Sequence, residues 1–188
     1  MTGGEARAHG GGVGGQTGDA APPVDGYRFL DGGARRVMRA WERREPAPEG
    51  IPWTPLARPL AEARVALISS AGVARTDDRP FDQEGERANP WWGDPTHRVL
   101  PRETRTDQIR VHHLHIDPRP GEADLDVLLP LRRLDELVRE GVVGASADEH
   151  YSVMGYILEP TTLLAETAPA LARGLAAQQV DLALLVPV

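Results

Sequence analysis

The chain has 188 residues, of which 40% are hydrophobic, a formal net charge of −7 and no cysteine. This length allows one domain of ordinary size with a substantial core. The negative charge argues against a nucleic-acid-binding surface, because binding phosphates requires clustered positive charge. The lack of cysteine excludes disulfides, thiolate catalysis and zinc–thiolate sites within these residues.

No apolar run approaches the roughly 20 residues that a membrane-spanning helix requires, and the first residues lack the apolar stretch of a secretory signal. We therefore expect a cytoplasmic protein. Residues 1–25 are rich in glycine and lack periodicity. We expect a disordered leader there, because such residues cannot bury enough apolar surface to offset chain entropy. Residues 26–188 are expected to form a single α/β domain.

Helical spacing of apolar residues predicts a first helix over residues 27–44, which Pro46 and Pro48 would end. Prolines interrupt residues 51–60 and predict an extended segment there, because each proline fixes its own φ and restricts its predecessor. The apolar stripe of the first helix consists of Phe29, Val37, Met38 and Trp41.

Residues 63–69 predict the first buried strand, and Ser69, Ser70 and Gly72 stand where it ends. A strand that breaks into small residues can bring free backbone N–H groups close to a ligand. We therefore treat Ser69, Ser70 and Gly72 as candidate substrate-binding residues. An ordinary strand-to-loop turn is the alternative interpretation.

Residues 73–108 are predicted to form a long polar loop, of the kind that often serves as a lid or binds a partner. The loop contains Trp91 and Trp92, which cannot both face one core in a helix or a strand. Either one tryptophan packs on the body while the other meets a partner or substrate, or both cover a small core of the loop itself.

Residues 109–117 predict a second strand, on which His113, His115 and Asp117 would share a face while His112 points the other way. Two imidazoles and a carboxylate could bind a metal ion. They could equally serve acid–base work or contact a substrate anion. A semi-buried layer of hydrogen-bonded histidines is the third interpretation.

Leucine spacing predicts a helix over residues 131–138, and Thr167 is a plausible N-cap for a later helix that runs to about residue 179. Residues 146–155 are predicted to be irregular. They contain His150 and Tyr151, which are either active-site residues or parts of a solvated loop with one packed tyrosine. Residues 180–188 predict a final buried strand. The alternation of strands and helices predicts a three-layer α/β sandwich with a largely parallel sheet.

Six segments in order resemble one family, the selenoprotein B family of glycine, sarcosine and betaine reductase and of D-proline reductase. Each segment alone is short, and their ordered combination carries the resemblance. The segments are residues 52–55 (PWTP), 64–73 (RVALISSAGV), 80–82 (PFD), 113–117 (HLHID), 150–155 (HYSVMG) and 180–188 (VDLALLVPV).

The resemblance implies that a selenocysteine, or a cysteine in some members, follows Val188 directly, and that a further helix–strand–helix portion completes the domain. We therefore expect the chain to be a truncated translation of a longer gene, stopped at a misread UGA codon, with the elements after the last strand missing. The nucleophile would displace an amine that a carbonyl group, such as a pyruvoyl on a partner subunit, activates. His113, His115, Asp117, His150 and Tyr151 would then line the mouth of the pocket.

The function implied is that of a selenium- or cysteine-dependent oxidoreductase subunit, which cleaves a C–N bond of an amino acid or amine such as glycine, sarcosine, betaine or D-proline. Its partners would be the other subunits of a reductase complex and the small substrate. The residues alone leave two further interpretations open. One is a non-catalytic α/β scaffold or small-ligand-binding protein, and the other is a histidine-based metal-dependent enzyme.

Overall fold

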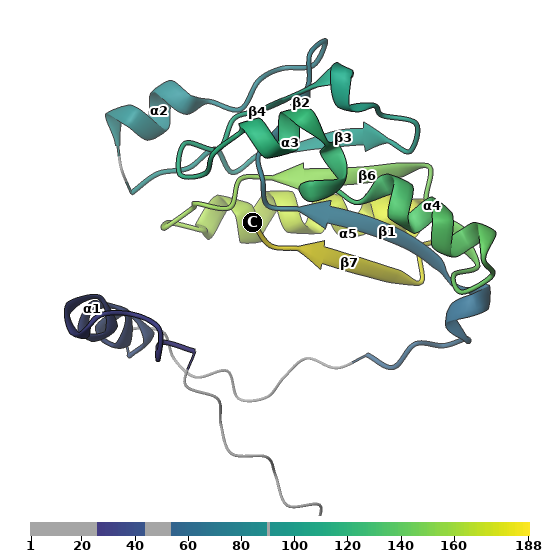
Figure 1. Ribbon diagram of the computed structural model, residues 1–188, viewed down its shortest axis with the longest axis horizontal. Helices are drawn as coiled ribbons and strands as arrows, with labels where there is room; N and C mark the ends of the chain where they lie inside the picture. The colour runs from purple at the N-terminus through teal and green to yellow at the C-terminus, as the bar shows by residue number, and fades with distance from the viewer. Residues whose placement is uncertain (1–25, 44–53, 90) are drawn as a thin grey trace, which may run out of the picture. The chain divides into compact units, whose positions relative to one another are not determined.

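The computed structural model describes residues 26–43, 54–89 and 91–188, and contacts divide the chain into two compact units, residues 1–53 and 54–188 (Figure 1). In the first unit, α1 (Gly32–Glu42) begins where the Asp31 carboxylate accepts hydrogen bonds from the backbone N–H groups of Gly33 and Ala34. The predicted first helix is therefore confirmed in its central part. The predicted leader, and the prolines that would end this helix, lie outside the described residues. A single domain over residues 26–188 stays a prediction.

The second unit is built on a five-stranded sheet whose central strand is β1 (Arg64–Ser69). On one edge, β5 (Ala145–Ser146) and β6 (Glu149–Val153) pair with β1 in parallel. On the other edge, β7 (Leu182–Val186) pairs with β1, also in parallel. β3 (His97–Pro101) completes the sheet, antiparallel to β6. The predicted α/β fold with a mostly parallel sheet is confirmed, and the three-layer arrangement stays a prediction.

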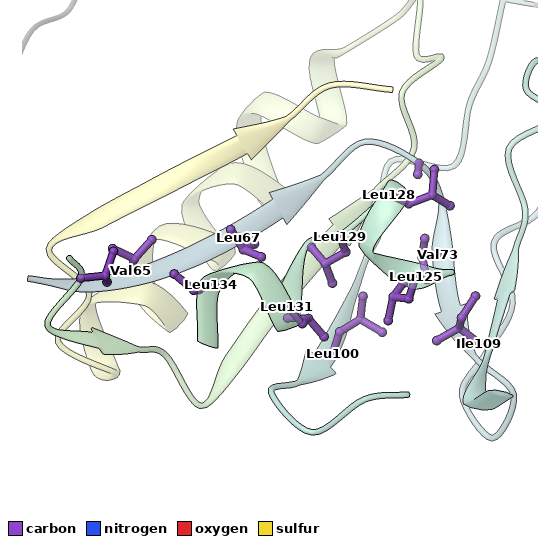
Figure 2. Close-up of a cluster of buried hydrophobic side chains, with 12 residues drawn as sticks. Val65, Leu67, Val73, Leu100, Ile109, Leu125, Leu128, Leu129, Leu131 and Leu134 are labelled. Carbon is purple, nitrogen blue, oxygen red and sulfur yellow. The ribbon is translucent and has the colours of Figure 1, made fainter. Parts of the chain in front are cut away.

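A leucine-rich core covers the face of β1 that carries Val65 and Leu67 (Figure 2). The helix α4 (Leu131–Arg139) packs on this face through Leu131 and Leu134, which confirms the helix predicted from leucine spacing. Gly141, with a φ of 73°, follows the helix in the left-handed conformation that favours glycine. The short turns η1 (Leu60–Glu62), η2 (Thr106–Gln108) and η3 (Leu125–Val127) and the helix α3 (Arg119–Ala123) complete the connections.

The prediction of a long loop over residues 73–108 is wrong. This segment holds β2 (Val73–Arg75), α2 (Gln83–Ala88) and β3. β2 pairs with β4 (Ile109–Val111) in a small antiparallel sheet, and the strand predicted over residues 109–117 is confirmed only over β4. Strands of three to five residues whose partners lie far away in sequence leave no periodic signal that a pattern can detect.

The prediction that residues 146–155 are irregular is also wrong, because β6 lies inside the sheet between β1 and β3. Its polar residues His150 and Ser152 are buried and hydrogen-bonded. Ser152 Oγ accepts a 2.8 Å hydrogen bond from the Val73 N–H, and His150 Nδ1 accepts a 2.9 Å hydrogen bond from the Leu67 N–H. These side chains accept hydrogen bonds from backbone N–H groups of neighbouring strands, so a strand inside the sheet contains the polar residues that are typical of a loop.

The C-terminal helical segment is continuous through Thr167, so the N-cap prediction is wrong. A π-helical stretch (Leu163–Thr167) leads directly into α5 (Ala168–Ala177). Pro169 lacks the N–H that a regular helix needs in its interior, and a wider turn before it accommodates that loss. Thr167 Oγ1 instead donates a 2.6 Å hydrogen bond to the Pro95 carbonyl oxygen.

The final strand is confirmed as β7, but the prediction that it is buried is wrong. Leu184 is 49% exposed and Leu185 is 68% exposed. Among the strands that the structure describes, β7 pairs with β1 alone, so its outer edge and much of its apolar surface face solvent.

Within residues 26–43, 54–89 and 91–188, no helix is long and apolar enough to cross a membrane.

Matched substitutions on the two neighbouring strands test this packing. Leu67→Ala should lower the free energy of unfolding by about 2–5 kcal/mol, because the Leu67 side chain is fully buried. Leu185→Ala should lower it by about 0.5 kcal/mol or less, because most of that side chain already contacts water. Urea denaturation of both variants provides the measurement, and equal losses would contradict the packing described for β7.

Candidate active site

Three parallel strands bring their carboxyl ends to one edge of the sheet, where ligands bind in open α/β sheets. The Ser70 N–H, just after β1, donates a 3.1 Å hydrogen bond to the Val186 carbonyl oxygen of β7. The Val188 N–H donates a 2.9 Å hydrogen bond to Ser70 Oγ. On the other edge of β1, the Gly72 N–H donates to the Val153 carbonyl oxygen of β6. The ends of β1, β6 and β7 are thus tied together around Ser70.

Gly155 lies at a crowded point of this edge. A β carbon at Gly155 would lie 2.7 Å from the Ser70 carbonyl oxygen, 3.2 Å from Ser70 Oγ and 2.9 Å from His113 Nε2. Any larger residue would push these polar atoms away. Glycine at this position therefore allows Ser70 and His113 to converge beside the end of β7.

His113 is nearly buried and presents one ring nitrogen to this edge. Its Nδ1 accepts a 3.2 Å hydrogen bond from the His115 N–H, so in the neutral ring the proton belongs on Nε2, the atom beside Gly155. Burial, followed by the nearby His115 charge, lowers the pKa of His113. His113 is thus a neutral imidazole whose Nε2–H can donate a hydrogen bond at neutral pH.

His115 lies at the rim of the same group with its side chain half exposed. Its ring centroid is 5.8 Å from that of His113 and 4.1 Å from that of Tyr156. His115 Nε2 lies 2.8 Å from Glu86 Oε1, a carboxylate of helix α2 whose side chain is only 2% exposed. A carboxylate-bound imidazole at a rim can exchange protons with a bound molecule.

Glu86 was absent from the sequence-based candidates. The prediction instead placed Asp117 on one face with the two histidines. Among the described residues, the Asp117 carboxylate accepts hydrogen bonds from the backbone N–H and the guanidinium of Arg119, and the side-chain hydrogen bond from Arg119 lowers the pKa of the Asp117 carboxyl. The strand ends at Val111, so the alternation that would have aligned Asp117 with His113 and His115 does not apply. A glutamate in a short polar helix carried no sequence signal for its burial.

His150 and Tyr151 lie within the sheet on β6. His150 is fully buried, and besides accepting from the Leu67 N–H its Nε2 lies 3.2 Å from Ser146 Oγ. The Tyr151 hydroxyl accepts a 3.1 Å hydrogen bond from Gln178 Nε2, and burial raises the pKa of this phenol. Both side chains are occupied with neighbouring elements, which favours a structural role.

The loop after β1 offers a hydroxyl and no free backbone donor. The N–H groups of Ser70 and Gly72 bond to β7 and β6, and the Ala71 N–H donates to the buried Ser69 Oγ. The expectation of free N–H groups in this loop is therefore not met. Ser70 Oγ is the group that faces the strand ends, while Gly72, with a φ of 62°, turns the chain toward β2.

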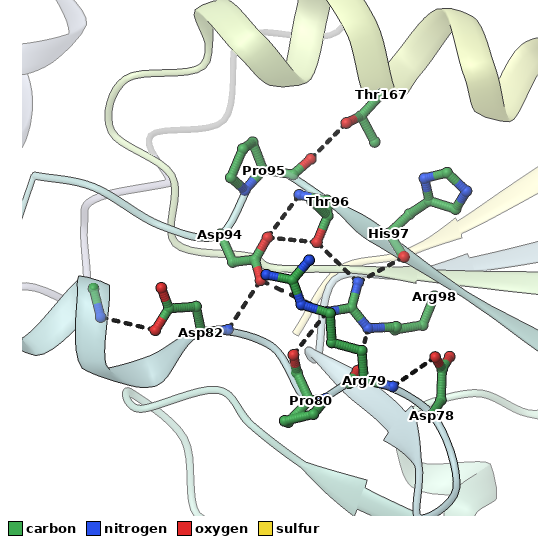
Figure 3. A network of polar contacts seen from close by, with 11 residues as sticks. Asp78, Arg79, Pro80, Asp82, Asp94, Pro95, Thr96, His97, Arg98 and Thr167 are labelled. Carbon is green, nitrogen blue, oxygen red and sulfur yellow. Dashed lines mark hydrogen bonds and ion pairs between the residues drawn. The ribbon is translucent and has the colours of Figure 1, made fainter.

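A buried polar network fixes the segment that leads into α2 (Figure 3). The Arg98 guanidinium of β3 donates to the carbonyl oxygens of Arg79 and Pro80 and lies 4.2 Å from the Phe81 ring centroid. Asp94 Oδ2 accepts a 2.9 Å hydrogen bond from the Asp82 N–H. Asp82 in turn caps α2 by accepting from the Gly85 N–H. The network therefore sets where α2, and with it Glu86, lies.

The two tryptophans between the two parts of this network in sequence differ in exposure. Trp91 is 57% exposed, whereas Trp92 is only partly accessible and its ring lies against Gly85 of α2. Trp92 thus packs on a helix of the same segment while Trp91 faces outward, so the two tryptophans do not both cover a core of that segment. Among the described residues, no three histidine, aspartate or glutamate side chains are grouped so that they could hold a metal ion.

His150 makes the stability of the protein depend on pH. Burial lowers the pKa of His150 from 6.5 to about 4. Below pH 6.5 the unfolded chain gains a proton that the folded chain does not accept until about pH 4, so stability falls through this range by at most about 3 kcal/mol. His150→Asn keeps an acceptor for the Leu67 N–H without titrating. Urea denaturation at pH 7 and pH 5 should show a smaller decrease for the variant, and identical decreases would contradict this assignment.

Comparisons with known proteins identify relatives among amino-acid reductases. No protein-family model and no solved structure matches the chain. The chain is 29% identical over 133 residues to D-proline reductase subunit gamma of Acetoanaerobium sticklandii, covering 71% of this chain and 52% of that protein. It is 29% identical over 110 residues to glycine reductase complex component B subunit gamma of Symbiobacterium thermophilum, covering 58% of this chain and 25% of that protein.

The chain thus spans about half the length of the first relative and a quarter of the second. It is homologous to the gamma subunits of D-proline reductase and of glycine reductase component B, which confirms the resemblance inferred from its ordered segments.

Proposed function

We propose that this chain belongs to a reductase subunit that takes part in the reductive cleavage of a C–N bond in an amino acid or amine, such as glycine, sarcosine, betaine or D-proline. The observation that carries the proposal is the convergence of Ser70, His113 and His115 at the carboxyl ends of β1, β6 and β7. This edge belongs to a chain homologous to two named reductase subunits.

We place the nucleophile, a selenocysteine or a cysteine, directly after Val188. Two features support this position. The resemblance of residues 180–188 to the family implies such a residue there, and Val188 is hydrogen-bonded to Ser70 Oγ at the edge where the strand ends meet. A selenolate or thiolate would supply the attack on the substrate carbon. The residues of this chain would surround it with donors, because the Ser70 hydroxyl and the His113 Nε2–H both face this edge.

His115 is the group to which we assign proton exchange. It is half exposed and held by a carboxylate, so it can give up a proton to a departing amine and regain one from solvent. His150, Tyr151 and Ser69 would support the sheet beneath the site, since each is buried on a strand and its side chain is hydrogen-bonded to a neighbouring segment. Asp117, exposed and paired with Arg119, would lie outside the reacting groups.

The proposal also implies partners. The relatives are named as subunits of D-proline reductase and of a glycine reductase complex, so we propose that this chain works with other subunits. A pyruvoyl or similar carbonyl group on one of them would activate the substrate amine. The exposed apolar side chains Leu184 and Leu185 are consistent with a protein that is covered by other polypeptide in its working state.

Substituting His115 tests the proposal. In the reductase complex isolated from its own cells, His115→Gln should lower the rate of product formation by about 100-fold or more, because it removes the group that exchanges the proton. His97→Gln is the matched control, since it removes a half-buried imidazole that packs against Tyr151 away from the site. Product from glycine, sarcosine, betaine and D-proline should be quantified with dithiothreitol as the reductant.

Two results would contradict the proposal. One is a folded, fully assembled complex that forms no product from any of these substrates, which would favour a scaffold or ligand-binding role. The other is equal activity of the His115→Gln and His97→Gln proteins, which would remove His115 from the reaction.

A further inference from the structure

Glu86 combines two properties that a purely structural residue rarely shows. Its side chain is almost completely buried, and one of its oxygens, Oε2, has no hydrogen-bond partner among the residues that the structure describes. Its other oxygen lies 2.8 Å from His115 Nε2. Burying a carboxylate is costly unless all of its acceptor sites are satisfied. A glutamine or an apolar residue would fill this space at lower cost, so the charge itself needs an explanation.

The helix that carries Glu86 holds the histidine loop from one side. Gln83 and Glu86 are three residues apart and lie on the same face of α2. Gln83 Nε2 donates a 2.8 Å hydrogen bond to the His112 carbonyl oxygen, while Glu86 reaches His115. Two side chains of one short helix thus fix both the backbone and the imidazole of the same loop.

The buried network of Figure 3 fixes this helix in turn. Asp94 binds the N–H of Asp82, the residue that caps α2, and Arg98 binds the carbonyl oxygen of Pro80 just before it. Trp92 packs on Gly85, where a β carbon would lie 2.5 Å from its ring. The position of Glu86 is therefore determined by residues of the folded body, before any ligand binds.

We infer that Glu86 is a positioning residue, which binds the Nε2–H of His115 and leaves Nδ1 as the atom that exchanges a proton at the mouth of the site. A carboxylate can only accept, so it fixes the proton on Nε2 and the ring orientation. Tyr156, whose ring centroid is 4.1 Å from that of His115, limits rotation from the other side. The catalytic consequence of this inference rests on the proposed function, whereas the hydrogen bond itself does not.

Nuclear magnetic resonance of the full chain tests the hydrogen bond without reference to activity. In protein labelled with nitrogen-15, the Nε2-bound proton of His115 should be visible and should exchange with solvent at least about tenfold more slowly than in Glu86→Ala. Glu86→Gln should retain a slowly exchanging proton, because the amide oxygen still accepts. Glu84→Gln is the control, since Glu84 lies on the same helix, is largely exposed and pairs with Arg87.

In the complete reductase complex, Glu86→Ala should lower kcat by about tenfold or more with little change in KM, because the His115 ring loses the hydrogen bond that orients it for proton exchange. Glu84→Gln should leave both constants unchanged.

Two results would overturn the inference. One is a folded wild-type protein in which His115 carries its proton on Nδ1. This measurement needs only the wild-type protein, so it does not depend on whether a variant folds. The other is a His115 Nε2 proton that exchanges as fast in the wild-type protein as in Glu86→Ala. A protected proton in a complex without reductase activity would uphold the positioning role and overturn only the proposed function.

Discussion

The structure depends on the parallel pairing of β1 with strands on both of its edges. Val65 and Ile68 each have a partner in β7, and their opposite edges pair with Ser146 of β5 and Tyr151 of β6. Because these strands run in the same direction, their carboxyl ends meet at one edge. The loop that follows β1 is then held between the other two strand ends by backbone hydrogen bonds. Ser70, which lies in this loop, takes its position from this arrangement.

Burial decides which histidine can do chemistry. His150 and His115 are both imidazoles, but their surroundings differ. His150 is enclosed, and its ring nitrogens face the Leu67 N–H and Ser146 Oγ, so its environment opposes protonation. His115 is half exposed and lies against a carboxylate. His113 occupies an intermediate position, nearly buried and with one nitrogen directed toward Ser70 and Gly155. We therefore propose a different role for each imidazole according to its solvation: a component of the sheet for His150, a hydrogen-bond donor for His113 and a proton carrier for His115.

The sequence predicts an element correctly where the residues of that element alone produce the pattern. The apolar run of β1, the leucine spacing of α4 and the terminal strand β7 were predicted in place, and His113 and His115 do lie together. The prediction of an element from the sequence failed where contacts with residues distant in the sequence determine its structure. β6 was missed because its polar side chains bond to backbone groups of β1 and β2, which no local pattern encodes.

Two errors in the candidate site have the same origin. Asp117 was grouped with the histidines on the assumption of a longer strand, and the chain turns before the alternation can extend that far. Glu86, which does reach His115, belongs to a helix placed by the buried network of Arg98 and Asp94, residues that lie apart from the histidine loop in sequence. A single sequence carries no information on such a pairing without the fold.

Mapping the reactive residue tests the central claim most directly. The protein isolated from its own cells would be treated with iodoacetamide, with and without substrate, and the alkylated peptide would be sequenced by mass spectrometry. If the strand ends around Ser70 form the active site, the modified residue is a selenocysteine or cysteine that follows Val188, and substrate slows its alkylation. An active complex whose reactive residue lies elsewhere, or which contains no alkylated residue after Val188, would contradict the account.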